Sequence, residues 1–193
     1  MGPWPSASWS AAVGAPTPRW GWHQLEPAWA ARLVADAALP AGALVIDVGA
    51  GQGALTGPLI AAGARVIAVE WHPARARYLR RHFGHRIVVV QADACDLRLP
   101  RQPYHVVANP PFGVTTALLR RLLQPGSRLL SAHLVLQHQA ARRWCDHDAP
   151  GRARWTRTFA ATRGAVIPRG AFHPRPPVDT RVLVIRRREV ERT

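Results

Sequence analysis

The 193-residue sequence has only two cysteines, no lysine and no internal repeat. Cys95 and Cys145 are too few for a disulfide framework and lack the spacing of metal ligands, so we expect a reduced cytoplasmic protein without a metal site. Residues 1–18 are rich in Ala, Pro, Ser and Gly but have neither a basic start nor a continuous apolar core. This composition excludes a signal peptide and a membrane span there, and it predicts a disordered tail.

Acidic residues are also few. All 26 strongly basic residues are arginine, and against 11 acidic residues they give a formal net charge of +15. An excess of this sign and size favours a polyanionic partner. The guanidinium group can form two hydrogen bonds to one phosphate and can also stack on a base. Most of these arginines are nevertheless expected to be solvated charges on helix faces.

From residue 26 onward, helical and extended patterns alternate, which predicts an α/β fold with a doubly wound, mostly parallel sheet. Helices are expected over residues 26–38, 54–62, 73–83, 115–123 and 137–147. Strands are expected over 43–48, 65–70, 86–91, 104–108 and 128–136, with 155–162 and 181–186 as a hairpin-like edge. The length suits a single domain with one core.

A glycine-rich turn, Gly49-Ala50-Gly51-Gln52-Gly53, follows the apolar run 44–48 and precedes a helix. Glycines at positions 49 and 51 let the backbone approach a ligand closely. A dinucleotide site would have the spacing G-x-G-x-x-G, whereas here the third glycine comes one residue early. The carboxylate of Asp47, before the turn, suits a ligand with a cationic amino-acid end better than a diphosphate. S-adenosylmethionine is such a ligand.

Two further acids stand at the ends of the next predicted strands. Glu70 can hold two ribose hydroxyl groups. Asp93, with Ala94 beside it, can accept a hydrogen bond from the amino group of an adenine. Because the carboxyl ends of parallel strands meet at one edge of the sheet, the three acids are expected to surround one cofactor.

The tetrapeptide Asn109-Pro110-Pro111-Phe112 directly follows the apolar run 104–108. The Asn109 side-chain oxygen and the Pro110 carbonyl can each accept one N–H of an exocyclic amino group, which turns the nitrogen lone pair toward an electrophile. The prolines have no N–H and fix φ, which stiffens the loop. Phe112 offers a face on which a base can stack. Taken alone, the tetrapeptide could also be an ordinary turn that ends a strand.

Together, these motifs resemble the rRNA adenine N6-methyltransferases, and among them the Erm type that modifies 23S rRNA. The most specific part is the late segment IPRGAFHPRPPVDT, at residues 167–180, which is similar to the family's Phe-x-Pro-x-Pro-x-Val-x-Ser pattern. The likeness covers residues 19–188. Residues 189–193 would form a short tail, because the family's helical C-terminal domain has no counterpart here, as in the short mycobacterial-type members.

The resemblance implies a Rossmann-like class I fold with a seven-stranded sheet and S-adenosylmethionine as cofactor. It implies methylation of N6 of one adenosine in the peptidyl-transferase loop of 23S rRNA, free or in an assembling large subunit, with resistance to macrolides, lincosamides and streptogramin B. The protein would be a cytoplasmic monomer without a membrane contact. Asn109 and Pro110 would orient N6, while Phe112 and Phe172 would clamp the base.

Where the family has Gln-Asn-Phe-Leu beside the cofactor, this sequence has Trp22-His23-Gln24-Leu25. The implied cofactor-binding residues are His23, Leu25, Asp47, Gly49, Gly51, Glu70, Asp93, Ala94 and Asn109. RNA is expected to contact Arg142, Arg143, Arg152 and Arg154, which lie between two predicted elements on the substrate side. Arg75 and Arg77 are expected on the opposite face of the sheet.

Other interpretations of the same motifs remain. A methyltransferase acting on N6 of adenine in DNA would share the tetrapeptide, but no target-recognition domain is evident. A protein glutamine methyltransferase would have little use for a charge of +15. A relative acting on small-subunit rRNA, or an RNA-binding relative with weak catalysis, would keep the same fold, although intact Asp47, Glu70, Asp93 and Asn109 favour an active enzyme.

Overall fold

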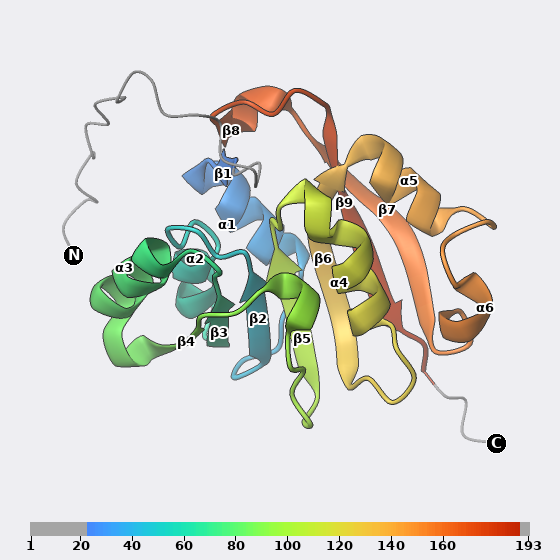
Figure 1. Ribbon diagram of the computed structural model, residues 1–193, viewed down its shortest axis with the longest axis horizontal. Helices are drawn as coiled ribbons and strands as arrows, with labels where there is room; N and C mark the ends of the chain where they lie inside the picture. Colours follow the sequence, from blue (N-terminus) through green and yellow to red (C-terminus); the bar gives the residue numbers. More distant parts are fainter. Residues whose placement is uncertain (1–22, 190–193) are drawn as a thin grey trace.

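The computed structural model describes residues 23–189, and a seven-stranded sheet runs through its middle in the order β4-β3-β2-β5-β6-β9-β7 (Figure 1). Five of these strands are parallel: β2 (Leu44–Val48), β3 (Arg65–Val69), β4 (Ile87–Val90), β5 (Tyr104–Ala108) and β6 (Leu129–Gln137). Two more complete one edge: β9 (Thr180–Arg187) is antiparallel to both β6 and β7 (Phe159–Ile167). This topology confirms the predicted α/β fold with a mostly parallel sheet of seven strands.

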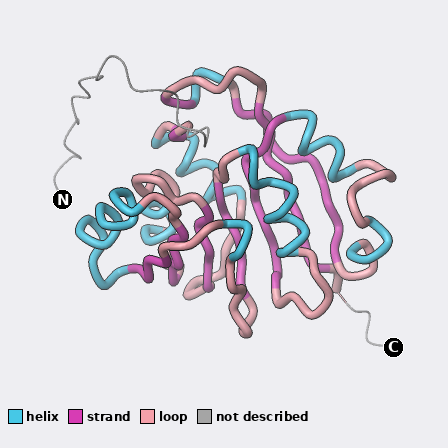
Figure 2. Tube along the Cα trace, viewed as in Figure 1, coloured by secondary structure: helices cyan, strands magenta, loops and turns pink. Residues whose placement is uncertain are grey.

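Helices cover both faces of the sheet, which makes the fold doubly wound (Figure 2). One face carries α1 (Pro27–Asp36), α2 (Thr56–Ala61) and α3 (Pro73–Phe83), whose buried side chains pack on inward-facing residues of β2, β3 and β5. The other face carries α4 (Thr115–Leu122), α5 (His138–Cys145) and α6 (Arg152–Trp155). Four short 3-10 turns connect these elements: η1 (Gly84–Arg86), η2 (Ala94–Asp96), η3 (Phe112–Val114) and η4 (Arg169–Ala171).

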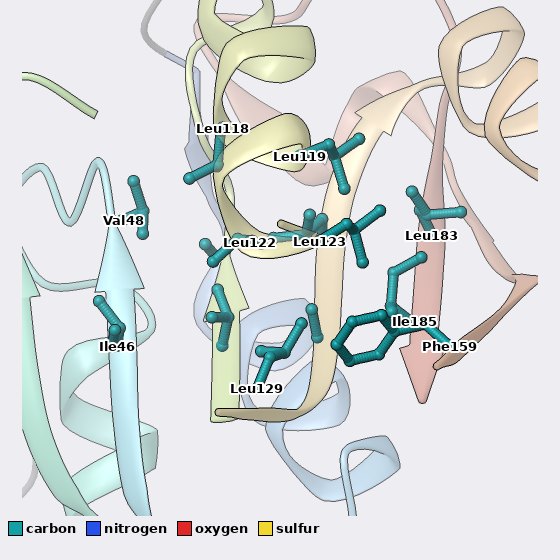
Figure 3. Packing of buried hydrophobic residues seen from close by; sticks show 14 of the residues in the cluster. Ile46, Val48, Leu118, Leu119, Leu122, Leu123, Leu129, Phe159, Leu183 and Ile185 are labelled. Atoms are coloured by element: carbon teal, nitrogen blue, oxygen red, sulfur yellow. The ribbon is translucent and has the colours of Figure 1, made fainter. Parts of the chain in front are cut away.

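The apolar pattern of the sequence accounts for these layers. All five residues of β2 are buried, as expected for a strand covered on both faces. On α4, Leu118, Leu119 and Leu122 recur at helical spacing and are fully buried. Figure 3 shows these leucines packed over β5 and β6 in the same cluster as Ile185 of β9. The core therefore holds the parallel strands in register and fixes the loops at their carboxyl ends.

The structure differs from the sequence prediction at the end of the chain. The strand predicted over 155–162 begins at Phe159 instead and extends to Ile167, because residues 152–155 form helix α6. Trp155 ends that helix with its ring buried near the ring of Trp144, at a centroid distance of 6.1 Å. Burial of this ring fits a helix whose apolar side faces the core better than an edge strand.

A second, two-stranded sheet was not predicted. It pairs β1 (Gln24–Leu25) with β8 (Phe172–His173) in antiparallel register, and the N–H of Glu26 donates to the carbonyl of Ala171 at 2.8 Å. This pairing brings the start of the described chain onto the segment 171–174. The predicted tail over 1–18, Trp22 and most of the predicted tail over 189–193 lie outside the described residues.

Candidate active site

The glycine turn after β2 packs directly against the Asn-Pro-Pro turn after β5. Gly49 has a φ of +73°, and a Cβ atom there would lie 3.0 Å from Cδ of Pro111 and 3.5 Å from Cα of Pro110. Glycine alone combines this backbone with this approach at little cost. The two turns lie where the strand order reverses between β2 and β5, which is the place where open α/β sheets bind ligands.

The early third glycine has a packing role. Gly53 has a φ of +89°, and a Cβ atom there would lie only 2.4 Å from Cε2 of Phe83. Phe83 is the buried last residue of α3. Position 53 thus lets α3 close against the turn, which explains why the spacing departs from the dinucleotide pattern.

Glu70, buried just after β3, ties the glycine turn to the next loop. Its Oε2 accepts a hydrogen bond from the N–H of Gly51 and its Oε1 accepts one from the N–H of His72, both at 2.8 Å. An ionised carboxylate offers about four acceptor positions. Two remain for further donors, so Glu70 can hold the turn and still accept hydroxyl groups of a ligand.

Asp47 is almost completely buried, with an exposed fraction of 1%. Its Oδ2 accepts a hydrogen bond from Oγ1 of Thr56 at 2.7 Å. Burial raises the pKa of Asp47 from 3.8 to about 7; the hydrogen bond from Thr56 opposes this shift and the charge of Glu70 adds to it. A cation placed beside Asp47 would favour the ionised form, which fits a ligand with an ammonium group.

Two hollows follow this edge of the sheet and share His23, Gly49 and Asn109. The larger is open to solvent, has a cavity volume of about 150 Å³ and is lined among others by Glu70, Asp93, Ala94, Asn109, Pro110 and Phe112. The smaller is lined among others by Leu25 and Asp47. Gly51 lines neither hollow but bonds to Glu70. The structure thus gathers the residues expected to bind the cofactor at one edge of the sheet.

Asp93 also shapes its own loop. Its Oδ1 accepts a hydrogen bond from the N–H of Cys95 at 2.8 Å, which caps η2. The cap holds Ala94 at the wall of the larger hollow. Burial raises the pKa of the Cys95 thiol, and the negative charge of Asp93 adds to that shift, so Cys95 is a thiol at neutral pH.

Sequence reasoning missed part of the wall. Trp71 lines the larger hollow with 57% of its surface exposed, and its place directly after Glu70 was the available signal. Arg75 lines it too, from the first turn of α3. Helix α3 lies on the face of the sheet opposite α5 and α6, where Arg75 and Arg77 were expected, and Arg75 also lines the larger hollow. Arg77 on the same helix is exposed and lines neither hollow.

Asn109 and His23 meet at the junction of the two hollows. The Asn109 side-chain nitrogen donates a hydrogen bond to the main-chain carbonyl of His23 at 2.7 Å. The His23 ring stacks with the ring of Phe112 at a centroid distance of 5.8 Å and an interplanar angle of 30°. The side-chain oxygen of Asn109 is thereby left as the end of the amide available to an amino group.

Phe172, expected to stack on the target base, lies in the core and not at the hollows. Its exposed fraction is 2%, it packs in the core with Leu25 and Ala171, and it lines neither hollow. Stacking on a base would require this ring to leave its packing. Its share in clamping the base stays a prediction.

The four arginines expected to bind RNA fall into two groups. Arg142 and Arg143 end α5, which begins at the carboxyl end of β6 on the side of Asn109. Arg152 and Arg154 belong to α6, beside the end of β9, where the side chain of Arg188 donates to the carbonyl of Thr156 at 2.9 Å. That end of β9 pairs with the start of β6, at the opposite end of the sheet from Asn109 (Figure 1).

Arg187, the last residue of β9, and Arg188 after it lie at the end of the sheet far from Asn109. The Arg187 side chain donates to the carbonyls of Leu129 and Ser127 and lies over the ring of Phe159. Within residues 23–189, no group of His, Cys, Asp and Glu side chains is placed to hold a metal ion. No helix in that range is long and apolar enough to cross a membrane.

Fold and site together define a class: a Rossmann-like α/β methyltransferase in which a glycine turn, three strand-end acids and an Asn-Pro-Pro-Phe turn border one crevice. The family follows from comparison. Residues 25–192 match the model of the ribosomal RNA adenine dimethylase family, and the chain belongs to this family. The family predicted from the motifs is thereby confirmed.

Individual relatives agree. An rRNA adenine N-6-methyltransferase of Corynebacterium diphtheriae is 38% identical over 146 residues, which cover 74% of this chain and 57% of the relative. The mycinamicin-resistance protein MyrB of Micromonospora griseorubida is 38% identical over 148 residues, covering 75% of this chain and 47% of MyrB. The crystal structure of the 23S rRNA methyltransferase ErmE superimposes with a TM-score of 0.74 at 30% identity, covering 83% of this chain and 68% of ErmE. The chain thus spans about half the length of the curated relatives it matches.

Proposed function

We propose that this protein transfers a methyl group from S-adenosylmethionine to N6 of one adenosine in the peptidyl-transferase loop of 23S rRNA. The observation that carries the proposal is the Asn109 amide: its nitrogen is bonded to the His23 carbonyl, so its oxygen is left to accept an N–H. Similarity to a protein named for 23S rRNA methylation and to one named for mycinamicin resistance supports this target and a role in resistance.

S-adenosylmethionine would supply a methyl group activated by a positively charged sulfur. In our proposal Glu70 accepts the ribose hydroxyl groups, Asp93 the adenine amino group, and Asp47 stabilises the cationic amino-acid end. Gly49 and Gly51 let the backbone approach the ligand. The free acceptor positions of Glu70 and the buried carboxyl of Asp47, whose ionised form a nearby cation would favour, support these roles.

The target adenosine must leave its stack, which costs a few kcal/mol and costs least in an RNA loop. The Asn109 side-chain oxygen and the Pro110 carbonyl then accept the two N6 hydrogens and aim the lone pair at the methyl group. Phe112 stacks on the base. The proton that N6 loses can pass to solvent, so positioning and electrostatics supply the rate enhancement.

RNA binding completes the proposal. Our predicted RNA contacts are still Arg142, Arg143, Arg152 and Arg154. Two further arginines lie closer to Asn109, on the loop after β8 and the turn before it. Arg175 directly follows Pro174, whose carbonyl lies 2.8 Å from His23 Nδ1, and Arg169 donates to the carbonyl of Pro176 in the same loop at 2.9 Å. We place these two exposed arginines close to the phosphates that flank the flipped adenosine. The protein would act in the cytoplasm as a monomer.

The test is methyl transfer in vitro, followed by mass spectrometry of the nucleosides. Purified protein is incubated with S-adenosylmethionine and with transcripts of the peptidyl-transferase loop or of small-subunit rRNA. We expect N6-methylated adenosine in the first transcript and none with Asn109→Ala. Product in the small-subunit transcript alone would change the substrate. If neither transcript is methylated although the cofactor and RNA bind, the protein is an RNA-binding protein and not an enzyme.

A further inference from the structure

His23 contacts three parts of the site at once. Its main-chain oxygen accepts the Asn109 side-chain N–H at 2.7 Å, its Nδ1 lies 2.8 Å from the carbonyl oxygen of Pro174, and its ring stacks with Phe112. Asn109 and Phe112 follow β5, whereas Pro174 lies 151 residues after His23, behind β8. One residue therefore joins the turn that would hold the amino group to the loop beyond Phe172.

The contact with Pro174 fixes the proton on the His23 ring. A carbonyl oxygen can only accept a hydrogen bond, so Nδ1 must carry the hydrogen. In the neutral ring Nε2 is then unprotonated.

The contact with Asn109 fixes the direction of its amide. If the amide were turned over, its oxygen would face the His23 carbonyl, and two acceptors would meet without a hydrogen between them. Because such a pair loses a hydrogen bond in a partly buried place, the observed direction is the favoured one. The oxygen of Asn109 is thus held on the side away from His23.

The neighbouring ladder holds residues 24–26 but does not reach residue 23. Gln24 pairs with His173, Leu25 pairs with Phe172, and the N–H of Glu26 donates to Ala171. Beyond this ladder, His23 is held through its ring and its carbonyl. The pairing of Gln24 thus fixes one side of the peptide group that carries the His23 carbonyl, and the ring contacts of His23 fix the other side.

We infer that His23 is a positioning residue for methyl transfer, whose ring, held between Pro174 and Phe112, keeps its own carbonyl where it orients the Asn109 amide toward the acceptor nitrogen. The inference rests on the proposed function and goes beyond it, because the family resemblance assigns this position to the cofactor. In this structure His23 contacts Asn109 and Phe112, in the turn proposed to bind the base. Misplacing a reacting group by about 1 Å can cost about 100-fold in rate, so a side chain that touches no reacting atom can still control the transfer step.

The first experiment compares His23→Ala, His23→Phe and a matched control, His173→Ala, in single-turnover methylation of the loop transcript. His173 is exposed and sits opposite Gln24, so its loss removes an imidazole next to the same loop. We expect His23→Ala to lower the rate about 10- to 100-fold. His23→Phe keeps the stacked ring and should lie between it and the wild type. The control should be unaffected.

Two readouts separate positioning from other roles. The affinity for S-adenosylhomocysteine should change far less than the rate; an equal loss of both would make His23 a cofactor ligand and overturn the inference. The shape of the pH–rate profile should be the same in all variants. Loss of one limb in both His23 variants would show a proton acceptor, which also overturns it.

A second experiment needs no activity. Asn109 is the only asparagine in the sequence, so labelling with ¹⁵N-asparagine gives a single side-chain amide in the NMR spectrum. With S-adenosylhomocysteine bound, we expect His23→Ala to shift this signal and speed its hydrogen exchange, and His173→Ala to leave it in place. An unchanged signal in His23→Ala would overturn the inference even if methylation were confirmed. If the wild type methylates no rRNA, the proposed function is wrong. The NMR result would still report whether His23 orients the Asn109 amide.

Discussion

The backbone N–H of Gly51 donates a 2.8 Å hydrogen bond to Oε2 of Glu70, so the acid that follows β3 holds the turn that follows the neighbouring strand β2. The same carboxylate accepts from the N–H of His72 through its other oxygen. Binding of a ligand to Glu70 therefore depends on the conformation of the glycine turn, because the same carboxylate holds that turn. Substitutions at either residue should act on cofactor binding and on stability together.

Glu70→Gln should weaken cofactor binding at least 10-fold and lower the stability by about 1–3 kcal/mol, because the new amide nitrogen would face one of two N–H donors that now bond to oxygen. Isothermal titration with S-adenosylhomocysteine and thermal melting measure the two effects. Glu26→Gln is the control, since Glu26 makes no side-chain cap on α1. Tighter binding of NAD than of S-adenosylhomocysteine by the wild type would contradict the assigned ligand.

Gly49→Ala should abolish cofactor binding and methylation. The left-handed backbone alone costs a non-glycine residue about 1–2 kcal/mol. Gly63→Ala is a matched control, because Gly63 has a φ of +77° but a Cβ atom there would meet nothing within 4 Å, whereas one at Gly49 would lie 3.0 Å from Pro111. Equal stability and equal cofactor affinity in the two variants would show that the contact between the turns has no effect.

Asp47→Asn should stabilise the unliganded protein at high pH. Since the pKa of Asp47 rises from 3.8 unfolded to about 7 folded, the native state holds a proton that the unfolded state has lost. Its contribution is complete below pH 3.8 and is lost as the pH rises through 7. We expect the variant to melt at least about 2 °C above the wild type at pH 8, which corresponds to about 1 kcal/mol in a domain of this size, with a smaller gain at pH 5.

The matched control for that series is Asp148→Asn, at an exposed position on the loop after α5. It should melt like the wild type at every pH. The affinity of Asp47→Asn for S-adenosylhomocysteine should fall, because the ligand's ammonium group loses its countercharge. A melting difference independent of pH would refute the assigned titration of Asp47.

Phe112→Ala should reduce methylation with little loss of stability, since stacking on a base is worth about 1–3 kcal/mol and the ring lines an open hollow. Phe172→Ala should cost about 3–5 kcal/mol of stability as a buried large-to-small change. Phe172→Leu separates the two roles, because it fills much of the space without an aromatic face. Normal turnover in Phe172→Leu would assign Phe172 to packing alone.

Affinity for an RNA hairpin should fall steeply with salt, because binding releases counterions from phosphates. Three double variants locate the RNA: Arg142→Gln/Arg143→Gln, Arg152→Gln/Arg154→Gln and Arg169→Gln/Arg175→Gln. Arg77→Gln/Arg81→Gln, on the exposed side of α3, is the control. The rim pair at 169 and 175 should flatten the slope of log K against log[salt] most, by about 1 per lost phosphate contact. If the control flattens it as much, the RNA lies on the other face.

The sequence predicted what depends on local pattern. Runs such as 44–48 and 104–108 are apolar throughout because both faces of their strands are covered, so their type and place were readable. The acids and the tetrapeptide lie at the ends of those runs, and parallel strands bring such ends together. For this reason the grouping of Asp47, Glu70, Asp93 and Asn109 around the two hollows could be predicted from the sequence.

What escaped prediction depends on long-range contacts. The two-residue strand β1 has no recognisable pattern and exists only because β8 pairs with it. The contacts of His23 cross 86 and 151 residues of sequence. Trp155 looked like the start of a strand because an aromatic residue suits a strand and a short buried helix equally. Tertiary packing decided these cases.

The pairing of residues 24–25 with 172–173 has a consequence for biosynthesis. A ribosome adds about 5–20 residues per second, so the segment that orients Asn109 waits roughly 7–30 s for its partner strand to be made. Until then the nascent chain holds the strands of the glycine turn and of Asn109 but no closed active site. The crevice can therefore take its final shape only after residues 172 and 173 have left the ribosome, however early residues 24 and 25 were made.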